Sequence, residues 1–154
     1  MRAVVQRVRD ASVEVDGQPI AAIGGGMVVL VAASIDDTPA ITDRTAARVA
    51  ALRIFDDEAG KMNRSIADTG GEVLAISQFT LYANLRRGNR PSFDRAAPRA
   101  FAEPLYERFC AAIEAAGIRC ARGIFGAEMS VRLVNDGPVT IIVDSADLEL
   151  PRRA

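Results

Sequence analysis

The sequence predicts a single α+β domain in which a mainly antiparallel sheet or half-barrel packs against two helices. Three observations lead to this prediction. Segments with a strand-like pattern outnumber helical ones, short turns join most neighbouring strands, and only two long stretches place apolar residues at helical spacing. At 154 residues the chain has the length of one domain, and no linker or repeat divides it. We therefore expect residues 1–154 to form one unit.

The first fifth of the chain is predicted to consist of strands. Alternating side chains indicate a strand from Arg2 to Val8 that resumes over 11–15, and Asp16-Gly17 is a hairpin signal leading into a strand over 18–23. After the Gly24-Gly25-Gly26 turn, the apolar run 27–33 is typical of a central strand that is buried on both faces.

Two helices are expected further along the chain. Thr38 is a plausible N-cap with Pro39 at the first helical position, and the helix that they begin should end near Ile54-Phe55, before an acidic turn over 56–60. The second helix carries Phe101, Leu105 and Phe109 on one face and should end at Gly117.

The remaining segments complete the predicted sheet. The run 72–77 is typical of another buried strand, and 82–93 has no clean period, so that it should form a long loop of the kind that is often functional. Three closing strands are expected over 118–121, 129–134 and 139–143, with Asn135-Asp136-Gly137-Pro138 connecting the last two.

Composition excludes several kinds of chemistry. The chain has no histidine, which rules out Ser-His-Asp and Cys-His mechanisms and any His-ligated metal. Cys110 and Cys120 lie ten apart without a CxxC pair, which favours buried, inert thiols over a zinc site or a redox pair. We therefore expect no metal and no cofactor. The apolar run 27–33 is far too short to span a membrane, and no signal peptide opens the chain, so we expect a cytoplasmic protein without a membrane partner.

Arginines are concentrated in one segment, although the formal net charge is only −1. Five of them fall within fourteen positions and are opposed only by Asp94: Arg86, Arg87, Arg90, Arg95 and Arg99. Arginine is suited to bidentate contact with phosphate, and the alternative is an ordinary solvated stretch.

Two short segments carry the strongest functional signals. Ser77-Gln78-Phe79-Thr80-Leu81-Tyr82 follows a buried strand, where polar groups either line a pocket or satisfy the local backbone. In Asn135-Asp136-Gly137-Pro138-Val139-Thr140, the proline after Gly137 disfavours an ordinary two-residue hairpin. The Gly-Pro bond is either a functional cis bond or part of a plain trans turn.

Over essentially its whole length the chain resembles the bacterial and eukaryotic D-aminoacyl-tRNA deacylases. Seven segments carry the resemblance in order: Met1-Arg2-Ala3-Val4-Val5-Gln6-Arg7-Val8, Leu52-Arg53-Ile54-Phe55, Gly60-Lys61-Met62-Asn63, Ser77-Gln78-Phe79-Thr80-Leu81-Tyr82, Gly88-Asn89-Arg90-Pro91-Ser92-Phe93, Phe125-Gly126-Ala127-Glu128-Met129 and Asn135-Asp136-Gly137-Pro138-Val139-Thr140. The resemblance implies an enzyme that hydrolyses the ester of D-aminoacyl-tRNA. Glycyl-tRNA should be a second substrate, because glycine has no side chain to reject.

The resemblance also implies roles for individual residues. The active-site floor would be formed by Ser77, Gln78, Phe79 and Thr80. In a homodimer, Gly137 and Pro138 would form a cis pair that enters the partner subunit's site and excludes L side chains, with Arg7 bracing their loop. Contacts to the terminal adenosine and to tRNA phosphates are expected from Phe125, Met129, Arg86, Arg87 and Arg90.

Without histidine, the backbone N–H groups of Phe79 and Thr80 are the candidates for stabilising the oxyanion, while the ribose 2′-hydroxyl orients the attacking water. The alternative makes the Thr80 hydroxyl a nucleophile, although no base is evident beside it. Two other functions remain open: a non-catalytic tRNA- or DNA-binding module, and a relative with a trans Gly137-Pro138 bond that tolerates small L-amino acids.

Overall fold

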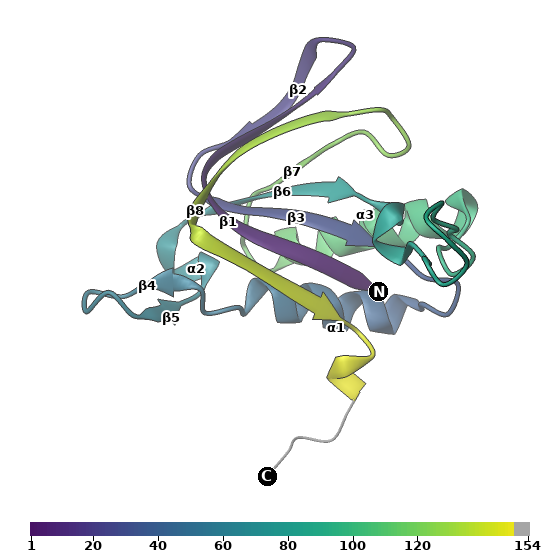
Figure 1. Cartoon of the computed structure of the whole chain (residues 1–154). Helices are drawn as coiled ribbons and strands as arrows, with labels where there is room; N and C mark the ends of the chain where they lie inside the picture. The colour runs from purple at the N-terminus through teal and green to yellow at the C-terminus, as the bar shows by residue number, and fades with distance from the viewer. Residues whose placement is uncertain (150–154) are drawn as a thin grey trace.

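The long strand β1 (Arg2–Val15) organises the sheet. The computed structural model describes residues 1–149, so the last five residues of the expected 1–154 domain lie outside the described part. One edge of β1 pairs antiparallel with β8 (Ser130–Asp144). The other edge pairs first with β3 (Gly26–Ala32) and then with β2 (Gln18–Ile23), which follows β1 through a two-residue hairpin (Figure 1). A single strand thus connects most of the sheet.

The other side of the sheet is parallel. Strand β6 (Glu72–Ser77) pairs parallel with β3, and β7 (Cys120–Arg122) pairs parallel with β6. Parallel neighbours need long crossover connections, and here these contain the helices. The sheet is therefore mixed, with antiparallel pairing around β1 as predicted and a parallel part where the apolar runs 27–33 and 72–77 lie side by side.

The long helices occupy one face of this sheet (Figure 1). Helix α1 (Pro39–Ala50) begins at Thr38, whose hydroxyl accepts the Ile41 N–H at 3.3 Å, and α3 (Arg99–Ala115) follows the arginine-rich loop. The short elements are α2 (Ile66–Thr69), the 3₁₀ turns η1 (Phe79–Tyr82) and η2 (Asp147–Glu149), and the hairpin of β4 (Phe55–Asp56) and β5 (Met62–Arg64). Within residues 1–149, no helix has the length and apolarity needed to cross a membrane.

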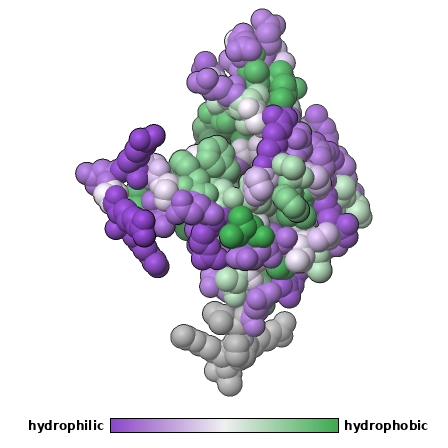
Figure 2. All heavy atoms as spheres, turned by 90° about the vertical axis from the view of Figure 1, so that its right-hand side faces the viewer, coloured by the Kyte–Doolittle hydropathy of each residue, from purple (hydrophilic) through white to green (hydrophobic). Residues whose placement is uncertain are grey.

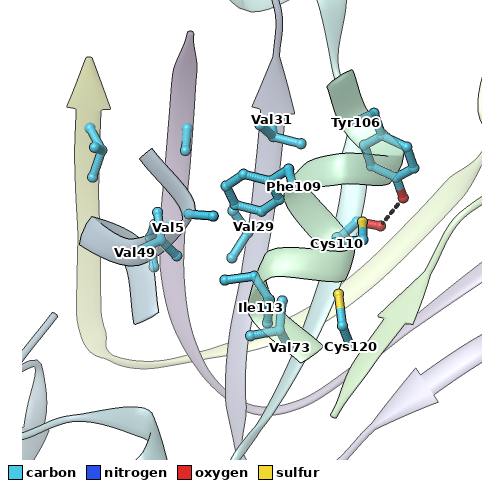
Figure 3. Close-up of a cluster of buried hydrophobic side chains, with 14 of the residues drawn as sticks. Val5, Val29, Val31, Val49, Val73, Tyr106, Phe109, Cys110, Ile113 and Cys120 are labelled. Carbon is cyan, nitrogen blue, oxygen red and sulfur yellow. Dashed lines mark hydrogen bonds between the residues drawn. The ribbon is translucent and has the colours of Figure 1, made fainter. Parts of the chain in front are cut away.

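The main core lies between the helices and the sheet. Phe109 and Ile113 of α3 pack against Val49 of α1 and against the inner face of the sheet, and all three side chains are fully buried (Figure 3). Cys110 and Cys120 are buried, unbridged thiols in the same core. A second, smaller cluster fills the opposite side, where the sheet curls toward itself: Val8, Ala11, Val13, Ile23, Val28, Leu74 and Ile76.

Two parts of the sequence prediction are wrong by more than two residues. Helix α1 ends at Ala50 rather than near Ile54-Phe55, because Phe55 pairs with Arg64 in the β4–β5 hairpin. The strands predicted over 129–134 and 139–143 are one strand, β8, and the segment Asn135–Pro138 is not a connection between strands. Gln6 pairs with Thr140 and Val8 with Asn135, so residues 136–139 bulge out opposite the single residue Arg7.

Candidate active site

A mostly apolar pocket of about 260 Å³ lies where β3 and β6 end. Its walls come from 31–33, from 76–79, from α3 and from 125–131. The pocket therefore brings together five of the predicted site residues: Ser77, Gln78, Phe79, Phe125 and Met129. Among residues 1–149, no acidic or basic side chain lines it. Figure 2 looks onto this end of the molecule, where green apolar surface is bordered by purple hydrophilic side chains.

The turn η1 carries the polar groups at one side of the pocket. The Gln78 N–H still donates to Val31 O, at 2.9 Å, as a continuation of the sheet, and the chain then enters the 3₁₀ turn. Leu81 is the first residue of the turn whose N–H donates a hydrogen bond within the turn, and it donates to Gln78 O at 3.1 Å. The N–H groups of Phe79 and Thr80 precede it, and the first amides of a helical turn have no partner inside the turn. Neither amide is therefore committed to a hydrogen bond within the turn.

The Thr80 hydroxyl has a neighbour that is not a base. Gln78 Nε2 donates to Thr80 Oγ1 at 2.5 Å, and an amide nitrogen cannot remove a proton from a hydroxyl. This contact favours Thr80 as a hydrogen-bonding group in the turn. The neighbouring Phe79 is 56% exposed, and its ring packs edge-on against Phe93 with the ring centroids 4.9 Å apart.

Tyr106 also lines the pocket, and the sequence analysis did not predict it as a site residue. A tyrosine within the mostly apolar second predicted helix could have indicated it. Its hydroxyl donates to Ala75 O at 2.9 Å, and burial raises the pKa of Tyr106 well above its ordinary value, so the hydroxyl stays protonated (Figure 3). The Phe125 ring lies 5.7 Å from the Tyr106 ring, and the Arg99 guanidinium lies 5.8 Å from the Phe125 centroid. These neighbours hold the Phe125 wall of the pocket.

Arg7 fills the space beneath the bulge of β8. Its side chain is buried and donates from Nε to Asp136 O at 2.8 Å and from Nη1 to Ile54 O at 2.7 Å. Asn135 closes the bulge from the other end, where its Oδ1 accepts the Val139 N–H at 2.8 Å. The Gly137–Pro138 peptide bond between these anchors is cis, and both residues are exposed.

The bulge and the pocket lie at opposite ends of β3 and β6. Arg7 pairs with Met27, which pairs with Val73, whereas Ser77 pairs with Val31. Four residues of β6 separate these levels, a distance of about 13 Å along the strand. The structure does not bring Arg7, Gly137 or Pro138 into the pocket of their own chain.

The arginine-rich segment falls into two groups. Arg95 pairs with Asp36 at 3.5 Å and Arg99 with Glu103 at 3.1 Å. Arg86, Arg87 and Arg90 are exposed in the loop that follows η1, and none forms an ion pair with any residue in 1–149. Their loop is closed by reciprocal Asn84–Ser92 backbone hydrogen bonds of 2.7 and 3.0 Å. Three free positive charges thus lie on the loop joining the pocket's turn to α3.

Solved structures share this fold. The chain superposes with a TM-score of 0.88 and 42% identity on a structure described as c-Myc DNA Unwinding Element Binding Protein, over 94% of this chain and 98% of that one. It also matches the fold of a probable eukaryotic D-amino acid tRNA deacylase, with a TM-score of 0.79, 18% identity, and coverage of 92% and 97%. The chain therefore has an α+β fold that it shares with a probable deacylase.

Sequence comparison identifies the family. The model of the D-Tyr-tRNA(Tyr) deacylase family matches residues 4–144. The D-aminoacyl-tRNA deacylase of Chloroflexus aurantiacus is 53% identical over 100% of this chain and 96% of its own length, and that of Cereibacter sphaeroides is 57% identical over 94% and 100%. The chain belongs to the D-Tyr-tRNA(Tyr) deacylase family, which is a family of hydrolases.

Proposed function

We propose that this chain hydrolyses the ester bond between a D-amino acid and the 3′ end of tRNA. The observation that carries the proposal is an apolar pocket, lined by Phe79, next to a 3₁₀ turn in which the Phe79 and Thr80 amides have no hydrogen-bond partner among residues 1–149. The apolar walls that include Phe125 and Met129 suit the terminal adenosine. Arg86, Arg87 and Arg90 carry the charge needed to contact the phosphates before it.

Hydrolysis needs only modest assistance, because an aminoacyl ester is already labile. The oxygen of a water molecule adds to the ester carbonyl, and the amides of Phe79 and Thr80 stabilise the resulting oxyanion; one such donor contributes about 3–4 kcal/mol. The intermediate then expels the ribose 3′ oxygen, which takes up a proton and leaves the free amino acid. The neighbouring ribose 2′-hydroxyl orients the water, in place of a protein base.

We infer that the working unit is a homodimer. Gly137 and Pro138 lie opposite Arg7, whose level in the sheet is about 13 Å along β6 from Ser77, and neither residue lines the pocket of its own chain, so we place their action in a second copy. There, their main-chain carbonyls would crowd one face of the substrate's α-carbon and reject an L side chain. Glycine escapes such a filter, so glycyl-tRNA becomes a second substrate. Charged tRNA is used in the cytoplasm, which is where we place the protein.

The test is the discharge of D-tyrosyl-, L-tyrosyl- and glycyl-tRNA by catalytic amounts of the protein, without added metal. We expect rapid loss of the D-tyrosyl and glycyl esters and persistence of the L-tyrosyl ester. Equal discharge of the two tyrosyl esters would contradict the proposed chiral filter. A monomeric mass in solution during active turnover would contradict the shared site.

A second candidate is a non-catalytic nucleic-acid-binding module, which is favoured by the 42% identity to the structure described as a DNA unwinding element binding protein. The same assay separates the two functions. A binding module would retain charged tRNA in a filter-binding measurement while every ester persisted.

Replacing Thr80 by alanine should leave at least a tenth of wild-type kcat for D-tyrosyl-tRNA. The substitution removes the hydroxyl that accepts from Gln78 but keeps the backbone N–H of residue 80, which is the proposed donor. Single-turnover discharge of D-tyrosyl-tRNA measures this directly. Complete loss of activity in a folded variant would instead support the hydroxyl as the nucleophile.

A further inference from the structure

We propose that Arg2 is a positioning residue that holds the η1 turn in its active geometry. This inference rests on the proposed function, because it concerns the turn that carries the Phe79 and Thr80 amides. Arg2 is the second residue of the chain, whereas η1 begins at Phe79, so the contact is made entirely by the tertiary fold. Arg2 lines neither the pocket nor the bulge of β8.

Arg2 contacts the turn in two ways. Its Nη1 donates to Leu81 O at 3.0 Å, and carbonyls at the end of a helical turn lack partners within it. Its guanidinium carbon also lies 4.8 Å from the centroid of the Tyr82 ring, within the range of a cation–π interaction. Tyr82 is buried, and burial raises its pKa to about 12, so that its ring remains neutral at physiological pH. The Arg2 side chain thus contacts both the backbone of η1, at Leu81, and the buried ring of Tyr82.

Arg2 is itself held by the sheet. Arg2 and Asp144 lie directly opposite each other in the β1–β8 ladder, and Arg2 Nε contacts Asp144 Oδ2 at 2.6 Å. Burial alone would raise the pKa of Asp144, but the hydrogen bonds from Arg2 and from the Ala146 N–H outweigh it and lower the pKa, so the carboxylate stays charged. The last residue of β8 is therefore connected to the candidate catalytic turn through Arg2.

Two hydrogen bonds from other parts of residues 1–149 hold the backbone of this turn, one at each end. The Gln78 N–H donates to Val31 O and fixes the entry to η1, whereas Arg2 fixes the exit at residues 81 and 82. Between the two lie Phe79 and Thr80, whose N–H groups must point at the same oxygen. Without Arg2 the exit can shift, and a displacement of about 1 Å at a reacting group can lower a rate up to about 100-fold.

The test compares Arg2→Met with Arg108→Met. Arg108 forms a two-bond ion pair with Asp43, at 2.7 Å for each bond, which joins α3 to α1 away from the pocket. It therefore controls for the loss of an arginine ion pair. We expect Arg2→Met to lower kcat for D-tyrosyl-tRNA about tenfold with KM within twofold of wild type. Arg108→Met should leave both constants within twofold.

Two further variants separate positioning from stability. Arg2→Lys retains the charge opposite Asp144 and over Tyr82 but lacks the planar fork, so it should recover only part of the lost kcat. Asp144→Asn leaves Arg2 in place but weakens its anchor, and should lower kcat less than Arg2→Met does. A kcat within twofold of wild type for folded Arg2→Met, or an equal loss for Arg108→Met, would overturn the inference. So would an increase in KM alone.

A probe of the amides distinguishes failure of this inference from failure of the proposed function. The probe is D-tyrosine joined through an amide to 3′-amino-3′-deoxyadenosine, which is not hydrolysed. In ¹⁵N NMR spectra we expect it to shift the Phe79 and Thr80 amide signals of the wild type and to shift them less in Arg2→Met. Unmoved signals in the wild type would refute the proposed oxyanion site itself. Moved signals combined with an unimpaired Arg2→Met would refute only the role of Arg2.

Discussion

Replacing Gly137 by alanine is expected to lower kcat/KM for D-tyrosyl-tRNA about 100-fold. Gly137 has a φ of +142°, which L side chains rarely adopt. An added Cβ would lie 2.7 Å from Val139 Cγ2, 3.0 Å from Val139 N and 3.3 Å from an Arg7 nitrogen. The bulge must therefore change shape, and the carbonyls that we propose as the chiral filter move with it. Single-turnover discharge measures the loss.

Gly25→Ala is the matched control. A Cβ at Gly25 meets nothing within 4 Å, so its activity and its thermal unfolding should both follow the wild type. We expect Gly137→Ala to remain folded, because its residue lies on the exposed tip of the bulge. A folded Gly137→Ala with kcat/KM within threefold of wild type would show that the shape of this bulge does not matter for catalysis.

Gly26→Ala should have the largest effect on folding. Gly26 begins β3 and pairs with Glu72 of β6, and an added Cβ would lie 1.9 Å from Glu72 O and 2.7 Å from Glu72 N. Neither atom can yield as a side chain does, so the parallel pairing must open or shift. We expect the free energy of unfolding in urea to fall by about 3 kcal/mol or more, at or beyond the upper end for overpacked sites.

The same control sharpens this second test. Gly25→Ala and Gly26→Ala change adjacent residues of the same glycine run by the same methyl group. Only Gly26→Ala should unfold at a lower urea concentration, because only a Cβ at residue 26 meets the backbone of β6. Equal urea midpoints for the two variants would show that the pairing of β3 with β6 tolerates the added carbon.

Local patterns were sufficient for most strands and for the second helix. The run Glu72–Ser77 and the hairpin strand Gln18–Ile23 were predicted with the bounds that the structure has, since alternation and apolar runs reflect burial at each position. The end of α1 was missed because Leu52, Ile54 and Phe55 continue an apolar pattern, while the conformation of Phe55 is decided by its pairing with Arg64, nine residues further along the chain.

The continuity of β8 could not be predicted from its own residues. Asp136-Gly137-Pro138 has the composition of a turn, and only the pairing of both flanks with β1, some 130 residues away in sequence, keeps the strand in one piece. The site shows the same division. Its segments 77–80 and 125–129 were found as motifs, but their meeting in one pocket, the contribution of Tyr106 and the separation from Gly137 depend on the three-dimensional fold.

The pairing of β1 with β8 has a consequence for how the protein is made. On the ribosome β1 emerges well before β8, and the edge of β1 that pairs with β8 has no partner until β8, the last strand among residues 1–149, has been synthesised. Pairing over so long a sequence separation is also slow to form. Asp144, which anchors Arg2, lies at the very end of that strand. A nascent chain therefore cannot assemble the braced turn early, and competence to act on charged tRNA is acquired only after β8 has been synthesised.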